Sequence, residues 1–195
     1  MAQVASAALP LELRTVVAGL VSADVSDDQQ WIVGLMRKHG LAVVTLLWRM
    51  LGSEQDVLDA YQTAICRLTA RGPDGLGSNP SGYFYRSVAN AGIEVLRARQ
   101  RQRACWPTVV DLQRRRSEDK PQPIGLDQRE MIDKMRQAIC QLPSHLRNVI
   151  VLRELAELPY AHVARILGIR NGTARLYRRE AILRLADMIG REANS

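Results

Sequence analysis

Arginine carries most of the positive charge in this chain of 195 residues, and two stretches hold more than half of the arginines. Residues 97–116 contain seven Arg and one acidic residue, and residues 165–184 contain six Arg and one acidic residue. A guanidinium group binds phosphate oxygens and guanine edges through paired hydrogen bonds. The two clusters therefore indicate two contacts with a polyanion, with solvated helix faces and a charged linker as the simpler alternative.

The first third of the chain has the opposite charge. Residues 1–65 hold four basic and seven acidic residues, although the whole chain has a net charge of +7. An acidic front followed by basic clusters indicates that the first part of the chain contacts a partner other than nucleic acid.

The residue types that carry catalysis or bind metals are few and scattered. The His residues lie far apart, and the three Cys fit neither a zinc spacing nor an even-numbered disulfide framework. We therefore expect no catalytic site, no metal and no cofactor, and we do not expect an enzyme. The residues concerned are His39, His145, His162, Cys66, Cys105 and Cys140.

The sequence also predicts where the protein works. No apolar run approaches the ~18–20 residues that span a bilayer, and the N-terminal residues lack the basic start of a signal peptide. Together with the unpaired Cys pattern, this predicts a reduced cytoplasmic protein without membrane contact.

The composition predicts an all-α fold. Hydrophobic residues make up 47 % of the chain and aromatic residues only 5 %, so Leu, Ile, Val and Ala must fill the interior, which suits helices packed on helices. Helical periodicity, with Gly and Pro between helices, indicates two small helical domains joined by a linker. The predicted divisions are an N-terminal extension (1–26) with a short helix at 9–22, a helical domain (27–103), a linker (104–127) and a C-terminal helical domain (128–195) that contains a helix-turn-helix.

Turn residues set the boundaries in the first helical domain. Gly52 is expected to end one helix and Ser53 to cap the next. The Gly- and Pro-rich stretch 71–82 is predicted to be a loop, and a helix is expected from about residue 81 to residue 103.

The C-terminal domain has the pattern of a helix-turn-helix. Residues 160–189 contain a short helix that ends at Gly168, a turn, and a second helix from about residue 172. Arg175 and Arg179 are one turn apart on the second helix and share a face, which could lie in a DNA major groove. A plain helical hairpin with a basic exterior is the alternative.

The C-terminal domain resembles that of bacterial sigma factors. The stretch from residue 139 to residue 185 shows that family's Leu-Pro, an Arg four residues on, a Leu-rich helix, and a helix-turn-helix with Leu-Gly and Gly-Thr. The matching residues are Leu142, Pro143, Arg147, Leu152, Leu158, Tyr160, Ala164, Leu167, Gly168, Gly172 and Thr173.

A second match lies upstream. Residues 54–65 resemble the acidic helix of the sigma N-terminal domain, and residues 79–103 resemble its promoter-melting helix. In the second stretch the matches are Tyr85, Arg86, Asn90, Glu94, Leu96 and Arg97, with Tyr83 where the family usually has Trp. The two matches together cover about residues 27–187 and are similar to the short, two-domain extracytoplasmic-function (ECF) group of the sigma-70 family.

The resemblance implies a factor that binds core RNA polymerase through the β′ clamp helices and the β subunit. In the family the acidic helix makes the clamp contact. The corresponding residues here are Asp56, Leu58, Asp59, Tyr61 and Gln62, although Leu58 and Tyr61 could instead belong to the core and Asp59 could be a solvated acid.

The resemblance further implies that the melting helix and the loop before it contact the opened minus-ten element. Aromatic rings can stack on exposed bases, and Arg side chains can hold the phosphates. One helix cannot direct all three consecutive aromatic residues to the same side, so two of them could face the core. The candidate residues are Asp74, Asn79, Tyr83, Phe84, Tyr85, Arg86, Asn90, Arg97 and Arg101.

The second helix of the helix-turn-helix is then expected to bind the minus-thirty-five element. Here the sequence departs from the family, because Arg170 stands where a capping Ser is common, and Asn171 is predicted to cap the helix one residue later. The candidate residues are Arg170, Asn171, Thr173, Arg175, Arg178 and Arg179.

The leading hypothesis is a sigma factor that binds core polymerase, recognises a promoter, melts DNA and initiates transcription. Promoter DNA and an anti-sigma factor are the other implied partners, and a nucleoid location is implied while the protein is bound to polymerase. The alternatives are a stand-alone helix-turn-helix regulator and a sigma mimic that binds an anti-sigma factor.

Overall fold

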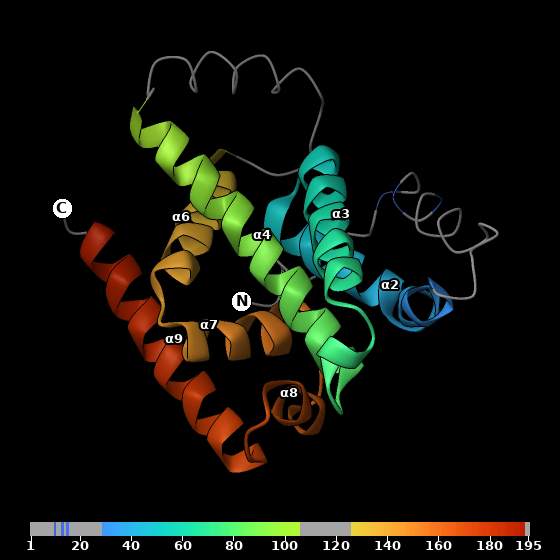
Figure 1. Cartoon of the computed structure of the whole chain (residues 1–195). Coiled ribbons are helices and arrows are strands. Elements are labelled where there is room, and N and C mark those ends of the chain that lie inside the picture. The colour runs from blue at the N-terminus through green and yellow to red at the C-terminus, as the bar shows by residue number, and fades with distance from the viewer. Residues whose placement is uncertain (1–9, 11–12, 14, 16–28, 106–125, 194–195) are drawn as a thin grey trace.

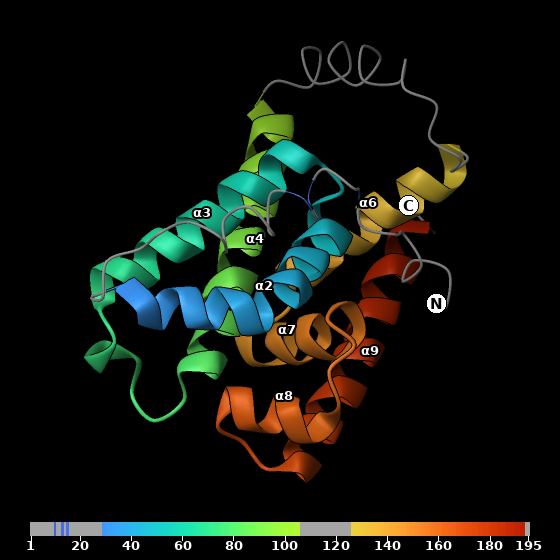
Figure 2. The ribbon, with the colours of Figure 1, turned by 90° about the vertical axis from the view of Figure 1, so that its right-hand side faces the viewer.

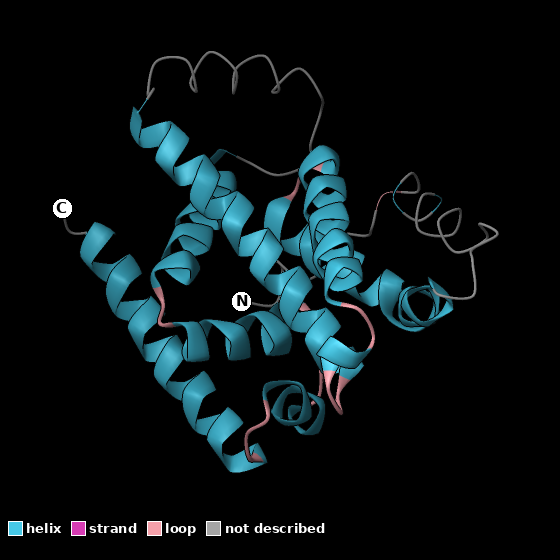
Figure 3. Cartoon of the chain, viewed as in Figure 1, coloured by secondary structure: helices cyan, strands magenta, loops and turns pink. Residues whose placement is uncertain are grey.

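The computed structural model describes residues 10, 13, 15, 29–105 and 126–193, and among these the side chains of residues 103–105, 126–127 and 192–193 are not described. Most of the helix predicted at 9–22 and nearly all of the predicted linker 104–127 lie outside the described residues. Helices make up the described ranges, which contain no strand (Figure 3). The all-α prediction is confirmed.

Three helices form the first group: α2 (Gln30–Leu51), α3 (Glu54–Arg71) and α4 (Pro80–Cys105) (Figure 1). The boundary between α2 and α3 follows the predicted turn residues. Gly52 has a left-handed φ of 65° and its N–H donates to the Trp48 carbonyl at 2.9 Å. The Ser53 hydroxyl accepts the Asp56 N–H at 3.5 Å and so marks the start of α3.

The loop before α4 is shorter than predicted. Helix α3 continues to Arg71, and a 3₁₀ turn, η3 (Asp74–Leu76), lies in the middle of the connection. Helix α4 begins at Pro80 because Asn79 caps it: the Asn79 side chain accepts the Gly82 N–H at 2.9 Å, and proline fits the first helical position.

The second group begins with α6 (Leu126–Gln141) and α7 (Ser144–Ile150), and α7 continues into a π-helical turn, η4 (Val151–Leu155). Helices α8 (Tyr160–Leu167) and α9 (Asn171–Ala193) follow and form the predicted helix-turn-helix. Between them Gly168 has a φ of 67°, a left-handed conformation that glycine adopts with little strain.

The cap of α9 differs from the prediction. The Arg170 carbonyl accepts the Ala174 N–H at 3.0 Å, which puts Arg170 at the cap position and makes Asn171 the first helical residue. Asn171 is therefore one residue too far along the chain to be the N-cap, because the turn after Gly168 is shorter than expected.

A buried arginine ties α6 to α7. Arg147 is the one charged residue among the described positions that is buried, and its guanidinium donates to the Cys140 and Leu142 carbonyls at 3.3 and 3.2 Å. Burial lowers its pKa. These carbonyls lie where α6 ends, so the Arg147 side chain fixes the turn into α7.

The two groups of helices pack against each other (Figures 1 and 2). The start of α4 lies beside α8, and α4 also contacts α6. Arg49 of α2 donates to the Leu155 carbonyl at 2.8 Å and forms an ion pair with Glu157 at 3.0 Å. None of the described helices has the length and hydropathy needed to cross a membrane.

Candidate nucleic-acid interface

Helix α9 has one face in the core and one face in solvent. Ala174, Ala181 and Leu185 are buried, and α9 packs against α6, α7 and α8. Arg175 and Arg179 are exposed, as the predicted shared face requires. This face belongs to the N-terminal half of the second helix, the part that meets base edges when a helix-turn-helix occupies a major groove.

Arg175 is positioned by an aromatic ring. Its guanidinium carbon lies 5.4 Å from the centroid of the Tyr160 ring, and that of Arg153 lies 4.8 Å from the same centroid. Stacking of a guanidinium on a ring restricts the long Arg side chain while its N–H donors remain free to bind. Tyr160 is the first residue of α8, so the contact also joins the two helices of the motif.

Arg178 lies outside the exposed face. Its Nε donates to Oε1 of Glu154 in η4 at 2.6 Å, and this hydrogen bond raises the pKa of Arg178. The sequence predicts Arg178 among the DNA-binding residues. The structure directs it toward η4, because residues 178 and 179 are about 100° apart around the helix.

Of the three remaining candidates at this end of α9, two are exposed and one is half-buried. Arg170 and Asn171 are exposed at the start of α9, and Thr173 is half-buried. Together with Arg175 and Arg179 they form the surface that α9 and its preceding turn offer to a phosphate backbone or a groove.

The start of α4 presents one aromatic ring and buries two. Phe84 and Tyr85 lie in the core, whereas Tyr83 is half-exposed. This corrects the assignment of Phe84 and Tyr85 as DNA-stacking residues, because the helix turns their rings inward. Tyr83 is the ring at this position that an unpaired base could reach.

Tyr83 is flanked by two guanidinium groups. The Arg71 guanidinium lies 5.0 Å and that of Arg86 5.9 Å from the ring centroid. Arg71 also donates to the Tyr83 hydroxyl at 3.1 Å and to the Gly75 carbonyl at 2.7 Å. Two cations therefore lie close to one half-exposed ring, which suits the combined recognition of bases and phosphates.

Two minus-ten candidates contact α8 in this structure. The Asn79 amide donates to the Arg165 carbonyl at 2.8 Å, and the Arg86 guanidinium donates to the Ile166 carbonyl. Both carbonyls lie in the last turn of α8, where helix carbonyls lack intrahelical partners. The helix-turn-helix thus covers part of the predicted minus-ten surface, while Asp74 is exposed nearby.

Farther along α4 the candidate residues are exposed. Asn90 and Arg101 lie at the surface, and Arg97 is exposed while its guanidinium donates to the Cys140 carbonyl at 3.4 Å. These side chains extend the basic surface of α4 away from α8.

The candidate polymerase contacts on α3 also include both exposed and buried residues. Leu58, Asp59 and Gln62 are exposed. Asp56 forms an ion pair with Arg99 of α4. Tyr61 is buried, 6.4 Å from the Phe84 ring between centroids, so it belongs to the core and the expectation of an apolar contact there is corrected.

The Tyr61 hydroxyl is itself unusual. It is buried, and no hydrogen-bond partner for it exists among the described residues. Burial raises the pKa of Tyr61 to about 12, because the phenolate is costly to form away from water.

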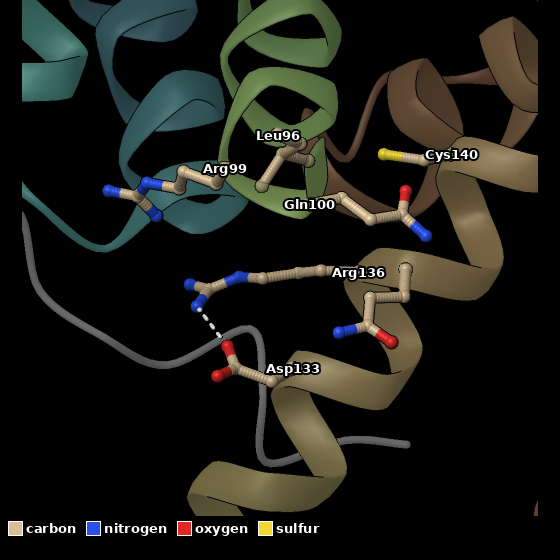
Figure 4. A pocket seen from close by; sticks show the side chains of 7 residues that line it. Leu96, Arg99, Gln100, Asp133, Arg136 and Cys140 are labelled. Carbon is tan, nitrogen blue, oxygen red and sulfur yellow. Dashed lines mark hydrogen bonds and ion pairs between the residues drawn. The ribbon is translucent and has the colours of Figure 1, made fainter. Parts of the chain in front are cut away.

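A small cleft separates α4 from α6 (Figure 4). Leu96, Arg99 and Gln100 line it from α4, and Asp133, Arg136, Gln137 and Cys140 from α6. Arg136 and Asp133, which are three residues apart on α6, form an ion pair at 3.3 Å. Burial raises the pKa of the Cys140 thiol, which makes it a weak nucleophile. Within the described ranges no cluster of three or more metal-binding side chains occurs.

Three residues with evident roles were not singled out from the sequence. Arg49 contacts Leu155 and Glu157, which are distant in the sequence, and Arg71 contacts Gly75 in a turn and Tyr83. No local sequence pattern indicates these contacts. Leu176 had a detectable signal: it is an apolar residue one position after Arg175 and three before Arg179, two of the residues predicted to bind DNA.

Two family models match the chain, one over each of the two groups of helices. The family model described as "Sigma-70 region 2" matches residues 35–102, and that described as "Sigma-70, region 4" matches residues 132–185. The first match spans α2 to α4, and the second includes the helix-turn-helix.

One relative is "ECF RNA polymerase sigma factor SigE" of Mycolicibacterium smegmatis, 28% identical over 142 residues, or 72% of this chain and 54% of that protein. The chain thus spans about half the length of this curated relative. A solved structure, "Co-crystal structure of the sigma factor RpoE in complex with the anti-sigma factor NepR from Bartonella quintana", has 19% identity and a TM-score of 0.43, covering 85% of this chain and 98% of that chain. With matches to regions 2 and 4 in order along its sequence, the chain belongs to the sigma-70 family, and the relative described above is an ECF member of that family.

Proposed function

We propose that the chain binds core RNA polymerase, directs it to promoters and assists their melting, acting as an initiation factor and not as an enzyme. The observation that carries the proposal is the pairing of region 2 and region 4 in one chain, each with an exposed surface of matching chemistry. Leu58, Asp59 and Gln62 offer an apolar and an acidic contact on α3, while α9 offers arginines.

The polymerase contact is assigned to the exposed row on α3. Asp59 and Gln62 are one turn apart, so their polar groups share a face with Leu58 close by. An acidic group and an amide beside an exposed leucine suit a basic helical partner, with Leu58 supplying the buried centre of the contact. The clamp helices of the β′ subunit are the proposed partner.

The DNA contacts are assigned to two surfaces. Arg175 and Arg179 of α9 bind the minus-thirty-five element as duplex, where guanidinium groups can pair with guanine or phosphate. Tyr83, between Arg71 and Arg86, stacks on an unpaired base of the minus-ten element.

Simultaneous use of both DNA surfaces requires the two groups of helices to separate. The minus-ten and minus-thirty-five elements are centred roughly 25 base pairs apart, about 85 Å along B-form DNA at 3.4 Å per pair. In the structure Asn79 lies only 2.8 Å from the Arg165 carbonyl of the helix-turn-helix. The connection from residue 105 to residue 126 can span at most about 70 Å. The connection and the widths of the two helical groups together are long enough for the chain to reach both promoter elements.

The test is binding of the full chain to core RNA polymerase of the source organism, measured by fluorescence anisotropy. The variant Asp59→Ala, Gln62→Ala removes an acid and an amide from the exposed face of α3. We expect its dissociation constant to rise at least about tenfold, as truncation of a contact worth about 1.4 kcal/mol would do. A matched control, Gln128→Ala, Glu130→Ala, likewise removes one amide and one carboxylate, from an exposed part of α6.

The outcomes separate the candidate functions. Tight binding by the wild type and the control, with weaker binding by the α3 variant, supports the sigma factor. A folded wild type that does not bind polymerase contradicts the proposal and favours a stand-alone regulator or an anti-sigma-binding mimic. Equal losses in both double variants would contradict the assignment of the contact to α3.

A further inference from the structure

A large apolar side chain lies on the face of α9 that is otherwise suited to DNA. Leu176 is 60% exposed, although other residues of α9 are buried in the core. It is the sixth residue of α9, within the N-terminal half of the helix. The exposed position therefore coincides with the part of a helix-turn-helix that reaches base edges.

The direction of Leu176 follows from its neighbours. Ala174, Ala181 and Leu185 mark the buried side of α9. Arg179 follows Leu176 by three residues and Arg175 by four, so Arg179 adjoins both of these exposed side chains on the surface of α9. A groove contacted by the two arginines is within reach of Leu176 as well.

The chemistry of the patch selects the target of Leu176. Arginine offers only hydrogen-bond donors, which match guanine N7 and O6 or phosphate oxygens. Leucine forms no hydrogen bond, and the apolar group on the major-groove edge of a base pair is the thymine C5 methyl. We infer that Leu176 is a specificity-determining residue that contacts the C5 methyl of a thymine in the duplex bound by α9. This inference rests on the proposed function.

Charge favours DNA over an apolar protein surface as the occupant. Leu176 lies between two exposed arginines, and Arg170 is exposed at the start of the same helix. A protein partner that buried Leu176 would have to desolvate these guanidinium groups or supply acids for them, whereas duplex DNA places phosphates on both sides of the groove.

The test removes the methyl group alone. Full chain bound to core polymerase is used to select a preferred sequence from a library of random duplexes, and each thymine in the selected site is then replaced by deoxyuridine. We expect one replacement in the part bound by α9 to weaken binding about fourfold, the loss of one buried methyl group at ~0.8 kcal/mol with 1.4 kcal/mol per factor of ten. The other replacements should change binding little.

Two variants assign the effect to its residue. Leu176→Ala should bind the thymine and deoxyuridine duplexes with equal affinity, because the methyl has lost its contact. Leu183→Ala is the matched control: Leu183 is 62% exposed on the same helix but lies beyond the half that reaches bases, and this variant should keep the fourfold difference. Both residues are exposed, so both variants are expected to fold, which circular dichroism checks.

Four results would overturn the inference. The inference fails if no deoxyuridine replacement in the selected sites changes binding. It also fails if the Leu176→Ala variant keeps the full difference between the thymine and deoxyuridine duplexes. Both results leave the proposed function intact. Loss of polymerase binding in both leucine variants would indicate a protein-binding face and overturn it too. Failure of the wild-type complex to select any sequence would refute the proposed function, and the inference with it.

Discussion

Two adjacent arginines on α9 are expected to respond oppositely to the same substitution. Arg178 is hydrogen-bonded to Glu154 at 2.6 Å, with side-chain exposures of 35% and 31%, whereas Arg179 is exposed to solvent. Removing Arg178 leaves a half-buried carboxylate without its cation. Removing Arg179 takes away a charge that faces solvent.

The magnitude follows from the geometry of the pair. A hydrogen bond between charged groups contributes about 1.5–3 kcal/mol when shielded, and an exposed ion pair contributes at most about 1 kcal/mol. The Arg178–Glu154 pair is intermediate in exposure. We expect Arg178→Ala to lower the free energy of unfolding by about 1 kcal/mol and Arg179→Ala to change it by less than about 0.5 kcal/mol.

The assay has two arms. Urea unfolding at pH 7, followed by circular dichroism, measures stability for Arg178→Ala, Glu154→Gln and the double variant. The double variant should lose less than the sum of the single losses, because both substitutions break one interaction. In the second arm, DNA binding by the polymerase complex is measured against salt, where Arg179→Ala should reduce the slope by about 1 if it contacts a phosphate.

The reasoning would be refuted by the reverse pattern. If Arg178→Ala were as stable as the wild type and reduced DNA affinity as much as Arg179→Ala, Arg178 would be a DNA-contacting residue, and the intramolecular pair would contribute nothing. Additive stability losses in the double variant would likewise show that Arg178 and Glu154 do not interact.

Three further predictions concern single side chains. Tyr61→Phe should raise the free energy of unfolding by about 1 kcal/mol in urea titrations, because it removes a buried hydroxyl that has no partner within the described part of the chain; equal or lower stability would contradict this. Burial, with smaller contributions from Lys38 and His162, lowers the pKa of His39. The folded state therefore binds a proton less readily than the unfolded chain, and thermal stability should fall as the pH drops below 6.5. His39→Gln should flatten that fall. Gly168→Ala should cost about 1–2 kcal/mol from its left-handed backbone alone, since no neighbour lies within 4 Å of the added methyl, whereas Gly168→Asn should cost less.

Local signals predicted the helix boundaries well because they act over a few residues. Gly52 and Gly168 end helices where the sequence requires a left-handed residue, and Ser53 caps α3 through its own side chain. The shared face of Arg175 and Arg179 follows from helical spacing alone. Helix α4 begins at Pro80, one residue before the predicted start, because Asn79 caps the helix and Pro80 fits its first position. The prediction places both residues in the loop.

Tertiary contacts decided what the sequence left open. Helical spacing shows that Tyr83, Phe84 and Tyr85 cannot share a face, but which of them is buried depends on α2 and α3 packing against α4. The pairing of Arg178 with Glu154 spans 24 residues. The contact of Arg86 with the end of α8 spans 80 residues, and no sequence pattern in either segment indicates it.

The central claim is that this chain makes core polymerase start at particular promoters. The most direct measurement is run-off transcription from a genomic fragment library with core polymerase alone, with the chain added, and with the Arg179→Ala variant added. The account predicts discrete transcripts that appear only when the chain is present and that weaken with the variant. A folded chain that binds polymerase yet yields no transcript beyond those of the core enzyme alone would contradict it.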